Sequence, residues 1–253
     1  MSFEQFNLKG KVALVTGANT GIGKGIACGL AEAGADIAAI GRSDMTETAR
    51  IIEGFGRKCL VIKADLSALD PVNGIINAAV AEFGKIDILV NNAGTIRRAD
   101  AVDYGVEDYD AVMNTNTRTL FFLSQAAAKQ FIKQGHGGKI VNIASMLSFQ
   151  GGIRVPAYTA SKSAVRGLTM AFANEWAKYG INVNAIAPGY IDTNNTAALK
   201  ADPVRSADIL ARIPAGRWGL PGDMAGAAVF LCSNAANYVH GAILPVDGGW
   251  FGR

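Results

Sequence analysis

The chain has 253 residues, enough for one large domain with a substantial hydrophobic core. Half of the residues are hydrophobic and only 18% are charged, a composition that excludes a disordered chain. The formal net charge is +3 and no run of basic residues is present, so nucleic-acid binding is not expected.

Targeting segments and metal motifs are missing from the sequence. No apolar run approaches the ~18 residues that a membrane-spanning helix needs, and the amino terminus lacks the apolar region of a secretory signal. The three cysteines are far apart and form no C-x-x-C pair, which argues against a disulfide framework or a zinc site. We therefore expect a cytoplasmic protein without metal or membrane contacts. The two histidines, His136 and His240, lie beside glycines in predicted loops and are assigned no role.

Short β-branched apolar runs alternate with longer helical stretches along the chain. In chain order, strands are predicted in "KVALVTGA" (11–18), "ADIAAIGR" (35–42), "KCLVIKADL" (58–66), "IDILVNNAG" (86–94), "GKIVNIAS" (138–145), "INVNAIAPG" (181–189) and "GAILPVDGG" (241–249). Helical periodicity lies between them, for example over 25–34, 75–83 and 164–178. Continuous apolar strands in alternation with helices are typical of a parallel sheet covered on both faces.

These elements predict an α/β fold. We expect residues 1–253 to form a single Rossmann-type domain, with a doubly wound sheet of about seven parallel strands and helices on both faces. The long segment without a predicted strand, about 193–237, is expected to be a substrate lid or insertion.

The stretch "TGANTGIG", residues 16–23, joins the first predicted strand to the first helix. Backbone N–H groups at the amino end of a helix bind a pyrophosphate, and glycines allow the backbone to approach it closely. A phosphate P-loop does not fit, because Lys24 and Gly25 follow and supply no hydroxyl for magnesium. The turn therefore favours a dinucleotide over a purely structural tight turn.

The end of the second strand bears on the choice of dinucleotide. NAD-binding domains usually place a carboxylate there, whereas this chain has Gly41, Arg42 and Ser43. A guanidinium binds a 2′-phosphate through charge-assisted hydrogen bonds. We predict NADP(H) as the favoured cofactor, with NAD(H) possible because Arg42 could instead stack on adenine and Asp44 lies close by.

The stretch "YTASK" places a phenol and an amine four residues apart, at Tyr158 and Lys162, and therefore on one face of a helix. A cation beside a tyrosine favours its phenolate form and makes the side chain a usable acid or base. An isolated pair of this kind is more often a core tyrosine followed by a surface lysine, so the rest of the chain must decide.

Taken together, these motifs resemble the short-chain dehydrogenase/reductase family over essentially the whole chain. The resemblance is carried, in the family's order, by "TGANTGIG", "NNAG" (91–94), "MNTNT" (113–117), "NIASM" (142–146), "YTASK" and "PGYIDT" (188–193). It implies an NAD(P)-dependent oxidoreductase, and the family commonly forms tetramers, so a homotetramer is expected.

The resemblance also implies roles for individual residues. Tyr158 would be the general acid and base, and Lys162 would lower the pKa of Tyr158 and hold the nicotinamide ribose. Ser145 would hydrogen-bond the substrate oxygen. Asn116 would hold a water that relays protons. The cofactor contacts implied are Gly17, Asn19, Gly21, Ile22, Gly23, Arg42, Ser43, Asp65, Leu66, Asn92, Ala93, Gly94, Tyr158, Lys162, Pro188, Gly189, Ile191 and Thr193. Asn91 is expected to tie neighbouring strands together instead.

The loop between Ser145 and Tyr158 indicates the substrate class. It offers Ser148, Gln150 and Arg154, and a basic pair, Arg97 and Arg98, follows the fourth strand, so a small polyhydroxylated ketone with a carboxylate is expected. The alternative for any one of these arginines is an ion pair on the surface or between subunits.

Longer stretches resemble one group within the family. "NIASMLSFQGGIRVPAYTASKSAV", "NEWAKYGINVNAIAPGY" and "RIPAGRWGLP" are similar to the 2-dehydro-3-deoxy-D-gluconate 5-dehydrogenases, also called 2-deoxy-D-gluconate 3-dehydrogenases. That group interconverts 2,5-diketo-3-deoxygluconate and 2-keto-3-deoxygluconate. Gluconate 5-dehydrogenase, or another polyol or keto-acid reductase, remains the alternative. The alternative from another class is a non-catalytic dinucleotide sensor, although such proteins typically lack the tyrosine or the lysine.

Overall fold

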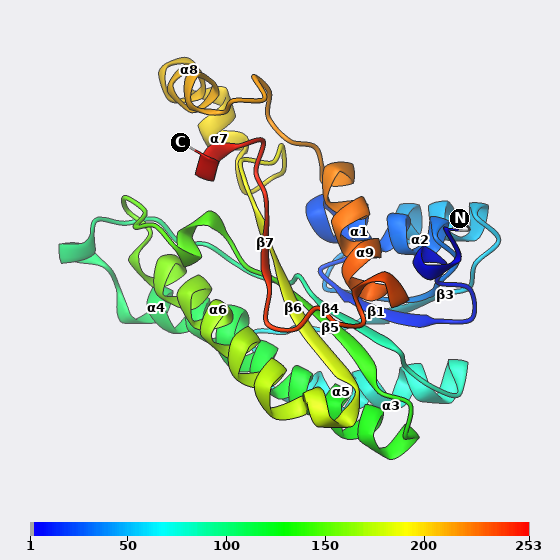
Figure 1. Ribbon diagram of the computed structural model, residues 1–253. Coiled ribbons are helices and arrows are strands. Elements are labelled where there is room, and N and C mark those ends of the chain that lie inside the picture. Colours follow the sequence, from blue (N-terminus) through cyan, green and yellow to red (C-terminus); the bar gives the residue numbers. More distant parts are fainter. Residues whose placement is uncertain (1–2, 253) are drawn as a thin grey trace.

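Seven parallel strands form one central sheet (Figure 1), and the computed structural model describes residues 3–252. The strands are β1 (Val12–Thr16), β2 (Asp36–Gly41), β3 (Cys59–Lys63), β4 (Ile88–Asn91), β5 (Gly138–Ile143), β6 (Ile181–Pro188) and β7 (Ile243–Val246). Their order in the sheet is β3-β2-β1-β4-β5-β6-β7, and every neighbouring pair is parallel. The predicted doubly wound Rossmann-type sheet is confirmed.

Helices cover both faces of the sheet (Figure 1). They are α1 (Gly21–Glu32), α2 (Thr46–Gly54), α3 (Pro71–Phe83), α4 (Val106–Met113), α5 (Leu120–Gln134), α6 (Pro156–Trp176), α7 (Ala197–Ala201), α8 (Pro203–Arg212) and α9 (Ala225–Cys232). Apolar side chains of α1, α2 and α9 pack on one face, and those of α3, α5 and α6 pack on the other. Within residues 3–252, we find no helix whose length and hydropathy would let it cross a membrane.

The strand β1 shows why its residues favour a sheet with two buried faces. Successive side chains of a strand point to opposite faces. Ala13 and Val15 accordingly pack in one core, while Val12 and Leu14 pack in the other, and all four are buried. A strand with only one buried face would alternate apolar and polar residues, so the continuous run "VALV" is what this architecture requires.

The segment between β6 and β7 divides into two parts. Helix α9 belongs to the layer on the sheet, because Gly29 of α1 lies so close to Ala225 that a Cβ on the glycine would be 2.5 Å from the alanine Cβ. Helices α7 and α8 lie beyond the strands, on the same side of the molecule as the carboxyl-terminal end (Figure 1). Lys200 of α7 pairs with Asp192, which holds this helix to the end of β6.

A small aromatic cluster supports the α7–α8 segment. Trp250 packs against Tyr190 with ring centroids 4.9 Å apart, and Tyr190 meets Trp218 edge-on at 5.6 Å. Ile209 and Ile213 of this segment are buried in the same cluster. The carboxyl-terminal residues therefore form part of the floor on which α7 and α8 rest.

A chain of buried polar side chains connects β4 and β5 to the helices behind them. The Asn91 amide donates to Ser124 Oγ and to Asn142 Oδ1, both at 2.9 Å, and the Asn142 amide donates to Thr169 Oγ1 at 3.0 Å. Because buried polar groups are costly unless they are hydrogen-bonded, this chain fixes the two strands against α5 and α6. The expectation that Asn91 ties strands together is confirmed.

The variant Asn91→Ala should lower the free energy of unfolding by about 1–3 kcal/mol, because it leaves the buried Ser124 hydroxyl and the Asn142 carbonyl oxygen without their partner. Urea denaturation measures this change. The exposed Asn174→Ala on α6 is the control and should shift stability by less than about 0.5 kcal/mol. Equal stability of the two variants would show that the buried chain contributes nothing.

Candidate active site

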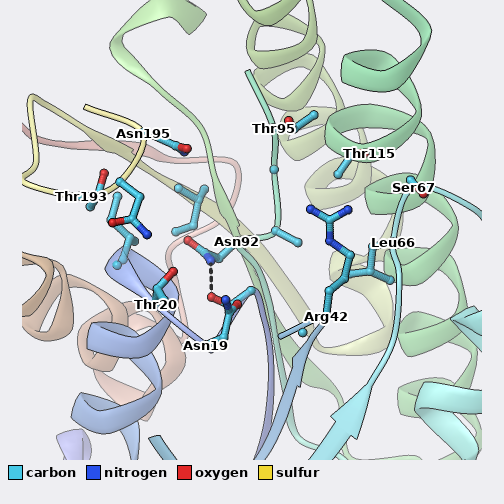
Figure 2. Close-up of a pocket in the computed structure, with 18 of the residues that line it drawn as sticks. Asn19, Thr20, Arg42, Leu66, Ser67, Asn92, Thr95, Thr115, Thr193 and Asn195 are labelled. Atoms are coloured by element: carbon cyan, nitrogen blue, oxygen red, sulfur yellow. Dashed lines mark hydrogen bonds between the residues drawn. The ribbon is translucent and has the colours of Figure 1, made fainter. Parts of the chain in front are cut away.

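A cleft of about 340 Å³ lies at the carboxyl ends of the strands, where the sheet order reverses between β1 and β4 (Figure 2). Open α/β sheets bind ligands at such a reversal, because the loops on either side run in opposite directions. Most of the residues predicted to contact a cofactor line this cleft: Gly17, Asn19, Gly21, Ile22, Arg42, Ser43, Asp65, Leu66, Asn92, Ala93, Gly94, Tyr158, Lys162 and Thr193.

The glycine turn leaves no room for side chains at two of its positions. Gly17 has φ +67°, and a Cβ there would lie 2.7 Å from Asn92 Nδ2. A Cβ on Gly23 would lie 2.1 Å from the Gly17 carbonyl oxygen, so the first turn of α1 packs directly on the preceding backbone. Backbone N–H groups at the start of α1 are thereby left open to a ligand, and these residues fit a dinucleotide pyrophosphate.

Asn92 locks the turn to the neighbouring strand. Its side-chain amide donates to the Thr16 carbonyl at 2.9 Å and to the Gly17 carbonyl at 3.3 Å. In return, the Thr16 hydroxyl accepts the backbone N–H groups of Asn92 and Ala93, each at 2.9 Å. The "NNAG" motif is thus a structural clamp on the glycine turn as well as a wall of the cleft.

Arg42 lies beside Leu66 in the cleft, at the opposite end from Thr20 and Thr193 (Figure 2). Its guanidinium is 3.8 Å from Asp65 Oδ2, and both side chains are mostly exposed. Hydrogen bonds from Ser67, with a smaller contribution from Arg42, lower the pKa of Asp65. An exposed pair at this distance is weak, so Arg42 keeps donors for another anion. Asn19 and Ser43, joined by a hydrogen bond of 3.0 Å, lie at the same strand ends.

Tyr158, Ser145 and Lys162 meet at the other end of the cleft. Pro156 begins α6 and places Tyr158 in its first turn, and Ser145 lies two residues after the end of β5. Burial raises the pKa of Tyr158, while a hydrogen bond with Ser145 and the charge of Arg98 act in the opposite direction. Arg98 is thus the arginine whose charge reaches the phenol.

Lys162 is buried beneath Tyr158. Its ammonium donates to the Ile143 carbonyl at 2.6 Å and lies 5.6 Å from the centroid of the Tyr158 ring. Burial lowers the pKa of Lys162 to about 8. The Ser148 hydroxyl donates to the Lys162 carbonyl at 2.7 Å and so fixes this turn of α6.

Asn116 lies in a π-helical segment, Asn114–Thr119, between α4 and α5. Its amide donates to the Thr95 carbonyl at 2.9 Å and to Ser161 Oγ at 3.1 Å, and its oxygen accepts the Thr95 N–H at 2.8 Å. The side chain therefore joins the loop after β4 to the helix that carries Tyr158 and Lys162. π-Helical turns occur frequently at functional sites.

Several predicted site residues lie outside the lining of the cleft. Gly23 and Ile191 pack behind it, Pro188 ends β6, and Gly189 after it presses against Asp247. The predicted catalytic residues Asn116 and Ser145 and the predicted substrate residue Arg98 also lie outside the lining. Of the residues predicted for the substrate, Gln150 accepts a hydrogen bond from Trp250 Nε1 at 3.2 Å, and Arg154 pairs with Asp100 at 3.2 Å. Ser148 is buried and faces the backbone of α6.

The cleft is also lined by residues to which the sequence pattern assigned no contact. They are Thr20, Gly41, Ala64, Ser67, Thr95, Ala111, Thr115, Ile143, Asn194 and Asn195, and Arg97 of the predicted basic pair lines the cleft as well. Thr20, Thr115 and Ile143 lie within the motifs "TGANTGIG", "MNTNT" and "NIASM", so their neighbourhood was a usable signal. Ala111 lies on α4, outside these motifs, and local spacing does not single it out.

Known proteins match this chain over its full length. A sequence profile described as enoyl-(acyl carrier protein) reductase, of the adh_short_C2 type, matches residues 17–251. The 2-dehydro-3-deoxy-D-gluconate 5-dehydrogenases of Dickeya dadantii (strain 3937) and Escherichia coli (strain K12) are each 60% identical over 253 residues, covering 100% of both chains. The chain belongs to the short-chain dehydrogenase/reductase family.

A solved structure agrees with this placement. It is a candidate 2-deoxy-D-gluconate 3-dehydrogenase from Agrobacterium tumefaciens with bound NADP, 56% identical to this chain. It superposes with a TM-score of 0.91 and covers 98% of this chain and 99% of its own. The predicted family and enzyme class, an NAD(P)-dependent oxidoreductase, are confirmed. Among residues 3–252, no group of three or more His, Cys, Asp or Glu side chains is placed to hold a metal ion.

The variant Gly23→Ala should reduce dinucleotide affinity by at least about tenfold, because the added Cβ would push α1 away from the Gly17 carbonyl and distort the pyrophosphate site. Isothermal titration with NADPH measures the affinity. Gly74→Ala is the matched control, since that exposed helical glycine has open space around it and the substitution should leave binding unchanged. Unchanged affinity in Gly23→Ala would contradict the assignment of the turn.

Proposed function

We propose that this protein is an NADP(H)-preferring 2-dehydro-3-deoxy-D-gluconate 5-dehydrogenase, which interconverts 2,5-diketo-3-deoxygluconate and 2-keto-3-deoxygluconate. One observation carries the reaction. Tyr158 lines the cleft with the Lys162 ammonium 5.6 Å from its ring centroid, and Ser145 and Arg98 both act to lower the pKa of the phenol, an arrangement suited to a ketone on a molecule that bears a carboxylate. The names of the two relatives at 60% identity support this substrate.

The dinucleotide would bind along the cleft with its pyrophosphate at the glycine turn and its adenosine end beside Leu66. Arg42 would hold the 2′-phosphate of NADP(H), which no carboxylate at the end of β2 would repel. When bound, the nicotinamide supplies or accepts the hydride. NADP bound to the Agrobacterium tumefaciens relative is consistent with this preference.

Tyr158 would transfer the proton that balances the hydride. In the reductive direction its hydroxyl donates a proton to the substrate carbonyl oxygen, and in the oxidative direction its phenolate takes the proton back. Ser145 would donate a hydrogen bond to the same oxygen and stabilise the negative charge that develops there. Burial keeps the phenol protonated at neutral pH, which suits the reductive direction.

Lys162 would bind the nicotinamide ribose and favour the phenolate when protonated. With a pKa of about 8, it also gains and loses protons near neutral pH, as a relay to solvent requires. Asn116, which bonds to both Thr95 and Ser161, would position this relay and hold its water.

Arg98 is our candidate for binding the substrate carboxylate. Its guanidinium donates to the Asn195 carbonyl at 3.0 Å, so it lies between the Tyr158 site and the segment that leads into α7. The neighbouring Arg97 is already paired with Asp108 at 3.2 Å. We propose that α7 and α8 close over the bound sugar acid as a lid on a single domain.

We also propose a homotetramer. Ala160, Gly167 and Ala171 are exposed along one side of α6, and such small residues would permit another helix to pack closely. Sedimentation velocity of the purified protein gives the oligomeric state.

The first experiment measures NADPH oxidation with 2,5-diketo-3-deoxygluconate, for the wild type and for Tyr158→Phe. The wild type should turn over, and the variant should lose about 10²-fold or more in kcat while it binds NADPH with unchanged affinity, because only the transferable proton is removed. A catalytically silent sensor would show no turnover in either protein. Turnover with gluconate instead would favour a gluconate 5-dehydrogenase.

The variant Arg42→Gln should lower kcat/KM for NADPH by about tenfold or more and leave that for NADH nearly unchanged, because the 2′-phosphate loses its charged partner. Initial rates with both cofactors at saturating substrate measure the ratio. Asp65→Asn serves as the control, since it removes the carboxylate that competes with the 2′-phosphate for Arg42. It should raise the ratio of kcat/KM for NADPH to that for NADH. Equal losses of kcat/KM with NADPH and NADH in Arg42→Gln would contradict the assignment of Arg42 to the 2′-phosphate.

The variant Arg98→Met should raise KM for the sugar acid by about tenfold and change the pH profile. The charge of Arg98 lowers the pKa of Tyr158, so its removal raises that pKa. Oxidation needs the phenolate, so its rate rises with pH, and this rise should move to higher pH in the variant. Arg97→Met is the matched control. A higher KM with an unmoved pH profile would place Arg98 away from the phenol.

A further inference from the structure

A second cavity of about 400 Å³ lies at the amino-terminal ends of the strands, the edge of the sheet opposite the cofactor cleft. Lys11 precedes β1, Asp87 precedes β4, and Lys139 and Asn182 are the second residues of β5 and β6. The remaining walls come from residues 7–8, 88, 136–138, 177, 180, 232–234, 237 and 240. The cofactor cleft uses none of these residues.

Lys139 is the central cation of this cavity. Its ammonium donates to Asn182 Oδ1 at 2.9 Å and to Asn237 Oδ1 at 2.7 Å, two neutral acceptors. Among residues 3–252, no carboxylate forms an ion pair with it. Burial lowers the pKa of Lys139 to about 8, the expected result for an ammonium that is withdrawn from water without a counter-charge.

Asp87 is the carboxylate in the lining of this cavity, and it is already paired with other cations. Lys85 lies 3.0 Å and Lys11 lies 3.6 Å from its oxygens, and the Val12 N–H donates to it at 2.9 Å. Two cations thus compensate one carboxylate before Lys139 is considered. The cavity carries a surplus of positive charge.

Other hydrogen-bond groups surround the ammonium. The Asn182 amide nitrogen donates to the carbonyls of Ala236, Asn237 and Val239 and lies 3.0 Å from His240 Nε2. His136, the other histidine without a sequence-derived role, lies on the same cavity.

We propose that this cavity binds a small oxyanion with two or more negative charges, such as a phosphate or a dicarboxylate, with Lys139 Nζ as its main contact. Lys139 uses two of its three N–H donors on the asparagines, so one remains for the anion. Lys11 and His240 line the same space, and Lys11 adds positive charge to it. The site is separate from the reaction and does not depend on which sugar acid the enzyme uses.

The test is isothermal titration of the NADP⁺-saturated enzyme with inorganic phosphate and, in a second series, with succinate, at constant ionic strength. Saturation with NADP⁺ fills the cofactor cleft, so these anions cannot bind there. The Arg98→Met variant, also saturated with NADP⁺, lacks the anion site that we propose beside Tyr158. We expect saturable binding in the wild type and in Arg98→Met. The two series show which oxyanion the site prefers.

Lys139→Gln should weaken this binding by about tenfold or more, because a charged hydrogen-bond donor is lost. The exposed Lys129→Gln on α5 makes the same change in net charge and should bind as the wild type does. Cofactor binding and turnover of each variant establish that it is folded. No saturable binding in the wild type, or equal binding in Lys139→Gln, would overturn the proposal.

Asn237→Asp is an independent variant that keeps Lys139 in place. The new carboxylate would lie where Asn237 Oδ1 now accepts from Lys139 Nζ, on an exposed side chain whose replacement changes no volume. It should supply the missing counter-charge and abolish anion binding. Retained binding in this variant would show that the unpaired charge of Lys139 is not what attracts the anion.

Discussion

The reversal of strand order between β1 and β4 is the constraint on which the rest of the site depends. Loops that leave these neighbouring strands run in opposite directions, and the space between them becomes the cleft. The Thr16 hydroxyl and the Asn92 amide hold the two strand ends together. The contact of Gly23 with the Gly17 carbonyl then fixes how closely α1 approaches. The proposed pyrophosphate binding would therefore depend on backbone packing, which side chains only support.

Buried hydrogen bonds transmit this rigidity to the reacting groups. Asn91 and Asn142 anchor β4 and β5 to the helices behind them, Asn116 joins the loop after β4 to α6, and Ser148 holds the carbonyl of Lys162. Each of these side chains satisfies buried partners and has no freedom to move without leaving one unpaired. The proposed catalytic residues lie on strand ends and a long helix that such bonds fix in place.

Burial acts on both members of the Tyr158–Lys162 pair and favours the neutral form of each. It raises the pKa of the phenol and lowers the pKa of the ammonium to about 8. The groups that oppose this effect on Tyr158 are Ser145 and Arg98, so the proposed substrate-binding and acid–base functions would share the same side chains. Lys139 shows the same effect of burial at the opposite edge of the sheet.

Local patterns in the sequence determined the sheet, the glycine turn and the spacing of Tyr158 and Lys162, whereas the proposed roles of Asn116 and Ser145 came from resemblance to the family. Apolar strand runs, glycine spacing and the four-residue interval of "YTASK" each act within a few residues of the chain, and so they are visible without a structure. Tertiary structure alone decided that Gln150 meets Trp250, that Arg154 meets Asp100 and that Arg98 reaches the phenol. It also brought Lys11, Asp87, Lys139 and Asn237 around one cavity. These residues are far apart in sequence, and only the order of strands in the sheet makes them neighbours.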